Sequence, residues 1–144
     1  MRIGIFDPYL DTLGGGEKYM LTAASCLSKN HEVNVFWDDP SILEKAMERF
    51  PLDLLSVGVA KNIFASWVSL WSRLWQTLSY DCIIYLSDGS IPLTFAKKLI
   101  VHFQFPVQWV DREEITTRMK LAQVTKMVCN SKFTKYYIDK VFHV

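Results

Sequence analysis

Cysteine is scarce in this sequence, and its spacing excludes two familiar kinds of site. Only Cys26, Cys82 and Cys129 occur among 144 residues, far apart and without a CxxC pair. No two histidines or cysteines have the spacing of zinc ligands, so we expect no metal site. An odd number of scattered cysteines also argues against a disulfide framework. We therefore expect reduced, buried thiols in a cytosolic protein.

An excess of one charge and a long apolar run are also missing. Sixteen Lys and Arg stand against fifteen Asp and Glu, a net charge of +1, which leaves no strongly positive face for a nucleic acid. No run of about 18 apolar residues could span a bilayer. The start, 1–7 (MRIGIFD), has too short an apolar run for a signal peptide. These absences favour a cytoplasmic protein without a nucleic-acid partner.

Half of the residues are apolar, and their spacing alternates between two periods. Short β-branched and aromatic runs predict strands, and apolar residues three and four apart predict helices. The expected strands are 2–6, 32–37, 52–59, 81–86, 98–103 and 126–129. The expected helices run from 17 to the turn at 30–31, from the turn at 38–41 to 49–51, over 62–79, over 111–123, and from 130–131 to the end. This alternation predicts a single α/β domain, a Rossmann-like parallel sheet flanked by helices.

Three consecutive glycines, Gly14, Gly15 and Gly16, follow the first expected strand after a loop at 8–13. The first N–H groups of a helix have no partner inside it and carry a partial positive charge. Glycine lets a ligand approach such a main chain closely, and ligands of parallel sheets gather at the carboxyl ends of strands. The loop is therefore a candidate site for an anionic or polyhydroxylated ligand. The alternative is that the glycines only turn the chain.

Two nucleotide-binding motifs fit this loop less well. A dinucleotide fingerprint, G-x-G-x-x-G, would use Gly14 and Gly16 with Asp38 or Asp39 as its acid, but Tyr19 stands where the third glycine belongs. No Gly-Lys-Ser/Thr completes a P-loop. Dinucleotide binding therefore remains a weaker alternative.

Three segments of the chain together resemble glycosyltransferase family 4. Residues 7–17 (DPYLDTLGGGE), with the helix and the turn 30–33 (NHEV) that follow, are similar to the family's opening strand, loop, GG(G)-E and GHEV-like turn. Residues 100–106 (IVHFQFP) look like the H-x-P segment of members that mannosylate lipid-linked oligosaccharides. Residues 128–134 (VCNSKFT) look like the V-x-N-S-x-F-T segment near the end of the family's first domain. The segments keep the family's order across nearly the whole chain.

The resemblance implies one half of a GT-B architecture. Residues 1–144 would be the amino-terminal, acceptor-side domain of a retaining enzyme that moves a sugar from a nucleotide sugar to a glycan or lipid-linked acceptor. The family requires no metal, and the nucleotide sugar is a co-substrate rather than a cofactor. The carboxy-terminal donor-binding domain is absent here, so the resemblance implies it as a partner, in a further domain or a separate subunit.

The resemblance also assigns roles to residues. Gly15 and Gly16 would donate N–H groups toward the donor diphosphate. His102 would hydrogen-bond a hydroxyl of the transferred sugar and is the catalytic candidate. A lone histidine is more often a core residue, but a place at a strand end before an aromatic-proline turn favours a site. Asn130 and Ser131 would begin the last helix of the domain.

Other candidates for substrate or donor binding come from their position in these segments. They are Gly14, Glu17, Gln104, Tyr9, Asp11 and Asp88. Tyr9 and Asp11 precede the glycines and are candidates for acceptor contact. Asp88 lies in the turn 87–90 after a strand, where it could touch a sugar hydroxyl, although turn chemistry explains it equally well.

Trp67, Trp71 and Trp75 recur every four residues in the helix expected at 62–79. We favour core packing for this stripe. The alternative is a partly exposed surface at a membrane interface, where tryptophan favours the headgroup layer. Arg73 is the only basic residue within the stripe, which weakens that alternative, whereas a lipid-linked acceptor would make peripheral membrane contact sensible.

We expect the purified 144-residue chain to turn over no nucleotide sugar, because the donor-binding half would be missing. An assay for released nucleoside diphosphate checks this, and steady release above the buffer blank contradicts it. The alternative, a non-catalytic binding or partner module on the same scaffold, also predicts no release of nucleoside diphosphate. The neighbouring gene separates the two, since an adjacent frame encoding a nucleotide-sugar domain supports the enzyme.

Overall fold

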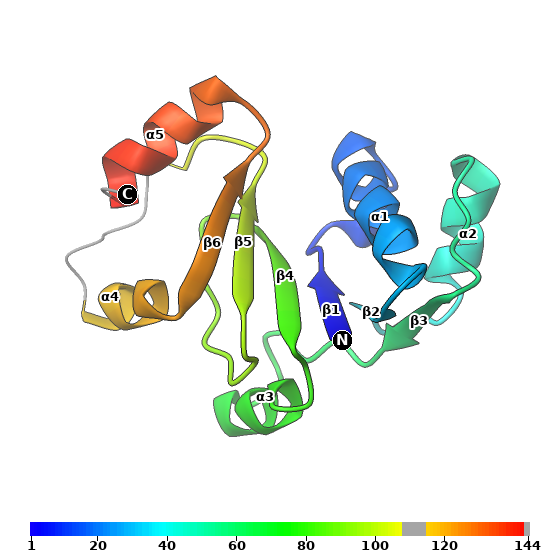
Figure 1. Ribbon diagram of the computed structural model, residues 1–144, viewed down its shortest axis with the longest axis horizontal. Coiled ribbons are helices and arrows are strands. Elements are labelled where there is room, and N and C mark those ends of the chain that lie inside the picture. The colour runs from blue at the N-terminus through cyan, green and yellow to red at the C-terminus, as the bar shows by residue number, and fades with distance from the viewer. Residues whose placement is uncertain (108–114, 143–144) are drawn as a thin grey trace.

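The computed structural model describes residues 1–107 and 115–142, which form a parallel sheet flanked by helices (Figure 1). The strands are β1 (Arg2–Phe6), β2 (Glu32–Phe36), β3 (Val57–Ala60), β4 (Cys82–Ser87), β5 (Leu99–Phe103) and β6 (Val124–Cys129). The helices are a 3-10 turn η1 (Leu10–Thr12), α1 (Gly15–Ser28), α2 (Ile42–Arg49), α3 (Leu70–Thr77), α4 (Ile115–Ala122) and α5 (Lys132–Phe142). The predicted α/β class with a Rossmann-like sheet is confirmed.

All strand pairs are parallel, and the described strands follow the order β3-β2-β1-β4-β5-β6. In register, Ile3 of β1 lies between Val33 of β2 and Cys82 of β4. The chain builds outward from β1 to β3 and then returns to start β4 on the other side of β1. The carboxyl ends of β1 and β4 therefore flank the switch point at which doubly wound sheets bind their ligands.

Both faces of the central strands are covered, which explains why β1 and β4 are almost continuously apolar. One apolar core lies between the sheet and the helices α1 and α2, with Met20, Leu21 and Ala46 among its buried members. The second core joins the opposite face to α5 and to the segment before α3. The second core contains an aromatic cluster whose ring centroids lie 4.8 to 5.3 Å apart: Phe6, Phe36, Phe64, Tyr80 and Tyr85.

Two predicted elements are shorter than expected because side chains compete for the backbone. The third strand begins at Val57 rather than at residue 52, since the Asp53 carboxylate accepts the Leu55 N–H in a turn (3.2 Å). The helix expected at 62–79 is helical only over Leu70–Thr77. The Asn62 side chain accepts the Phe64 N–H at 3.1 Å in a turn ahead of it.

Two burial predictions were wrong. The three tryptophans of the stripe are exposed by 68% or more, because α3 turns Leu74 and Thr77 inward instead. Trp67 lies outside the helix altogether. Cys26 is exposed on α1, whereas Cys82 is buried and Cys129 half-buried, and all three are free thiols.

Parts of two expected helices, 111–114 and 143–144, lie outside the described residues. Within residues 1–107 and 115–142, none of the helices combines the length and the apolarity that crossing a bilayer requires.

Gly4 offers a test of the packing in the centre of the sheet. A Cβ built at Gly4 would overlap the ring of Phe36 and lie 3.2 Å from the Tyr80 side chain, and both rings are buried. We expect Gly4→Ala to lower the free energy of unfolding by about 1–3 kcal/mol through overpacking, measured by urea denaturation. Gly15→Ala is the control, because a Cβ there meets nothing within 4 Å. Equal stability of the two variants would contradict this packing.

Candidate functional site at the carboxyl edge of the sheet

The loop between β1 and α1 ends in a hydrogen bond between the residue before α1 and the third residue of that helix. The Gly14 N–H donates to the Glu17 carboxylate Oε2 at 2.6 Å, and Glu17 is buried. Glu17 thereby satisfies one of the four N–H groups that a helix start leaves without an internal partner. Gly14 and Glu17 are thus occupied with each other, and the amides of the next residues are the ones that face outward.

Gly15 and Gly16 open α1, and among the described residues their N–H groups have no acceptor. Gly15 is exposed, and no atom beyond its chain neighbours lies within 4 Å of a Cβ built there. Gly16 is covered on one side by Gln104, whose Nε2 donates to the Gly16 carbonyl at 3.3 Å. The sequence-predicted donors therefore lie beside open space at Gly15 and beside one polar side chain at Gly16.

His102 is the penultimate residue of β5, at the same end of the sheet as the glycines. Its ring lies 4.9 Å from the ring of Tyr19 on α1, and the side chain is only 3% exposed. Burial lowers the pKa of His102, which favours the neutral imidazole. Neither ring nitrogen has a hydrogen-bond partner among the described residues. The predicted position is confirmed, but the tyrosine that replaces a third glycine covers the histidine.

Asp7, which was not predicted as a site residue, is fully buried directly after β1. Its Oδ1 accepts the Tyr9 N–H at 2.9 Å, and its Oδ2 has no partner among the described residues. Burial, together with the nearby Glu17 and Asp11 carboxylates, raises the pKa of Asp7 from 3.8 to about 6. The signal available in the sequence was an acid that ends a buried apolar strand immediately before the glycine loop.

A chain of hydrogen bonds connects the start of α1 with the start of α5. Gln104, which touches Gly16, accepts at its carbonyl a hydrogen bond from Asn130 Nδ2 (2.7 Å). The Asn130 Oδ1 accepts from the Thr134 hydroxyl at 3.0 Å, and the Ser131 Oγ accepts the Thr134 N–H at 3.0 Å. Ser131 thereby caps α5. Four residues predicted from distant segments, Gly16, Gln104, Asn130 and Ser131, are thus brought together.

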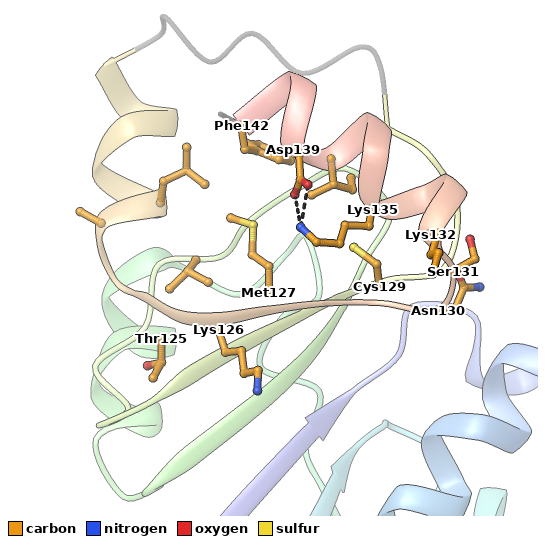
Figure 2. A pocket seen from close by; sticks show the side chains of 14 residues that line it. Thr125, Lys126, Met127, Cys129, Asn130, Ser131, Lys132, Lys135, Asp139 and Phe142 are labelled. Atoms are coloured by element: carbon orange, nitrogen blue, oxygen red, sulfur yellow. Dashed lines mark hydrogen bonds and ion pairs between the residues drawn. The ribbon is translucent and has the colours of Figure 1, made fainter. Parts of the chain in front are cut away.

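Asn130 and Ser131 also border a hollow on the outer side of β6, separate from the glycine loop. This groove, of about 800 Å³, lies between α4, β6 and α5 (Figure 2). Met127, Cys129 and Phe142 line it, and the ion pair of Lys135 with Asp139 (2.6 Å) runs along its α5 wall. Neither the glycines nor His102 contribute to its lining.

The remaining predicted residues are held in local turns. The Asp88 Oδ1 accepts the Ser90 N–H (3.1 Å) and the Ser90 hydroxyl (2.8 Å), in a turn where Gly89 has a φ of 116°. Turn chemistry therefore accounts for Asp88. Tyr9 and Asp11 lie at η1 with exposed side chains, close to the buried Asp7.

The chain matches no protein-family model, no curated protein and no solved structure. The candidate site is therefore defined by its geometry.

The buried carboxyl of Asp7 makes stability depend on pH in an unusual direction. Because its pKa is raised from 3.8 to about 6, its contribution is greatest below pH 4 and is lost as the pH rises through 6. The full effect corresponds to about 3 kcal/mol in the free energy of unfolding. We expect Asp7→Asn to remove this component, so that the variant gains stability relative to the parent between pH 4 and pH 7. Parallel urea titrations check this, and a constant difference across that range contradicts it.

Proposed function

We propose that the carboxyl edge of this sheet binds a polyhydroxylated ligand, and that the chain is the acceptor-side half of a retaining glycosyltransferase. The observation that carries the proposal is that hydrogen-bond donors and hydrogen-bond acceptors both occur near the start of α1. The free amides of Gly15 and Gly16 are donors. The nearby acceptors are the carboxylates of Glu17, which lies in the first turn of the same helix and bonds Gly14, and of Asp7 and Asp11 in the segment before it.

This mixture favours a sugar over a simple anion. The start of α1 attracts negative charge through its amides and its dipole. The Glu17 and Asp11 carboxylates both lie within electrostatic reach of Asp7, and this negative charge opposes a bare phosphate there. A sugar hydroxyl both donates and accepts, so a ring with several hydroxyls can satisfy amides and carboxylates together. A diphosphate carried on a sugar would need its own positive partner, which a second domain supplies in this proposal.

The buried polar atoms support the same proposal. His102 and Asp7 Oδ2 have no partner among the described residues although both are buried, and such groups cost stability unless a ligand or an ordered water satisfies them. Both belong to the carboxyl edge, where β1 and β5 end. Tyr19, whose side chain is half exposed, is the group whose movement would uncover His102.

The proposed reaction joins the anomeric carbon of a nucleotide sugar to an acceptor hydroxyl oxygen. The bond from that carbon to the phosphate oxygen breaks, and the acceptor proton leaves with the nucleoside diphosphate or through solvent. Donors on the second domain would stabilise the departing diphosphate charge, and closure against that domain would exclude water. Resemblance to glycosyltransferase family 4 in three segments, 7–17, 100–106 and 128–134, supports this assignment.

A dinucleotide is the second candidate ligand, since the strand order is that of dinucleotide-binding sheets. Two features count against it. Asp39 is engaged by Lys45 (2.7 Å) and Ser41 (2.7 Å), and Tyr19 packs on His102 where the fingerprint needs a glycine.

Titrations of the ¹⁵N-labelled chain, followed by NMR, test the proposal. The probes are a mannose disaccharide, GDP-mannose, UDP-glucose, inorganic phosphate and NAD. We expect saturable shifts at Gly15, Gly16 and His102 with the sugars and none with phosphate. Shifts produced by NAD alone would replace the proposal with dinucleotide binding, and sugar-induced shifts confined to the α4–β6–α5 groove would move the site.

A variant separates the open amide from the rest of the fold. Gly15→Val places a branched side chain in the space that is empty beside Gly15, so we expect binding of the sugar probe to weaken about tenfold or more, which is about 1.4 kcal/mol. Thr22→Val, at an exposed position of the same helix, is the matched control and should bind normally. Equal affinity of both variants would contradict a role for the Gly15 amide.

A further inference from the structure

The most exposed aromatic surface of the molecule surrounds α3. We define the tryptophan surface by its large apolar side chains and their exposed fractions: Trp67 (74%), Trp71 (70%), Trp75 (68%), Leu70 (44%) and Leu78 (49%). Trp71, Trp75 and Leu78 succeed one another at spacings of four and three, so they form one stripe along the helix. A contiguous apolar surface of this kind marks an interaction site more often than chance exposure.

The inner side of α3 is anchored, which keeps the stripe turned outward. Leu74 and Thr77 are buried, and the Thr77 hydroxyl accepts the Phe95 N–H at 2.8 Å. Arg73 donates from Nε to the Ile63 carbonyl at 3.0 Å. Rotation of the helix to bury its tryptophans would break these contacts.

The charged residues of the segment that carries this surface, Lys61 and Arg73, are both basic. No Asp or Glu occurs between Asp53 and Asp81. Lys61 shares a shallow hollow with Trp75, and Lys98 follows a segment that is hydrogen-bonded to the end of α3. Among the described residues, neither lysine has a carboxylate partner.

We propose that the tryptophan surface docks on the headgroup layer of an anionic phospholipid bilayer. Tryptophan and leucine beside basic residues are the composition of helices that lie in the plane of a membrane interface. Anionic lipid attracts each nearby Lys or Arg. A second copy of this chain fits less well, because a two-fold contact would bring Lys61 and Arg73 of both copies onto the same like-charged surface.

The position of α3 in the fold is compatible with such docking. Figure 1 shows α3 at the end of the sheet opposite to the passage from β1 into α1. A bilayer under α3 would therefore leave the carboxyl edge accessible. The proposal does not rest on ligand binding at that edge, and its test requires no sugar.

Flotation of the full 144-residue chain tests the docking, using vesicles of phosphatidylcholine alone and of phosphatidylcholine mixed with phosphatidylglycerol. We expect the chain to float with the mixed vesicles, and its tryptophan fluorescence to be quenched when bromine-labelled lipid is included. Trp71→Ala combined with Trp75→Ala should weaken the partition coefficient by on the order of tenfold or more. Lys61→Gln and Lys98→Gln should each weaken it roughly fivefold.

A matched pair on α5 provides the control. Phe133 and Tyr136 are similarly exposed, at 62% and 63%, so Phe133→Ala combined with Tyr136→Ala should leave flotation unchanged. Circular dichroism melting of each variant identifies any loss of folding. Three results would overturn the proposal: a soluble chain with both kinds of vesicle, equal binding to neutral and anionic vesicles, or a dimer in solution that the Trp71→Ala and Trp75→Ala changes dissolve.

Discussion

The contact between the Gly14 amide and the Glu17 carboxylate determines how the first strand meets the first helix. By taking the Gly14 N–H into the chain, it leaves the amides of Gly15 and Gly16 as the ones presented outward. It also buries Glu17 beside Asp7, and the proximity of the two acids adds to the burial that raises the Asp7 pKa. This one hydrogen bond therefore leaves the Gly15 and Gly16 amides as the available donors and places the Glu17 carboxylate close to them.

Among the buried polar atoms without a partner in the described residues, those of two side chains, Asp7 and His102, lie where strands end. Asp7 follows β1 and His102 stands near the end of β5, and each keeps a buried polar atom without a partner among the described residues. Folded proteins accept such local costs mainly at functional sites. The Asn130 and Gln104 contacts add rigidity, because they tie the start of α5 to the loop that follows β5 and, through Gly16, to α1.

The tryptophan surface lies at the opposite end of the sheet, and it consists of exposed apolar side chains rather than buried polar ones. Its side chains are exposed although they are the largest apolar groups of the chain. The buried residues of α3 are Leu74 and Thr77, so this helix contributes few side chains to the core. Two functional surfaces at opposite ends of one sheet would let the domain hold a membrane and a ligand at the same time.

Local periodicity and turn residues were enough to predict the α/β class, the parallel sheet and the glycine-bearing helix start. They also placed His102 at a strand end and Asn130-Ser131 at a helix start. Which faces of these elements are buried could not be predicted in this way. The fold turned Trp71 and Trp75 outward, delayed the start of the expected helix to Leu70, after the Asn62 turn, and buried Asp7. Burial depends on contacts between distant segments, such as Arg73 with the Ile63 carbonyl and Tyr19 with His102, and spacing along one segment does not contain that information.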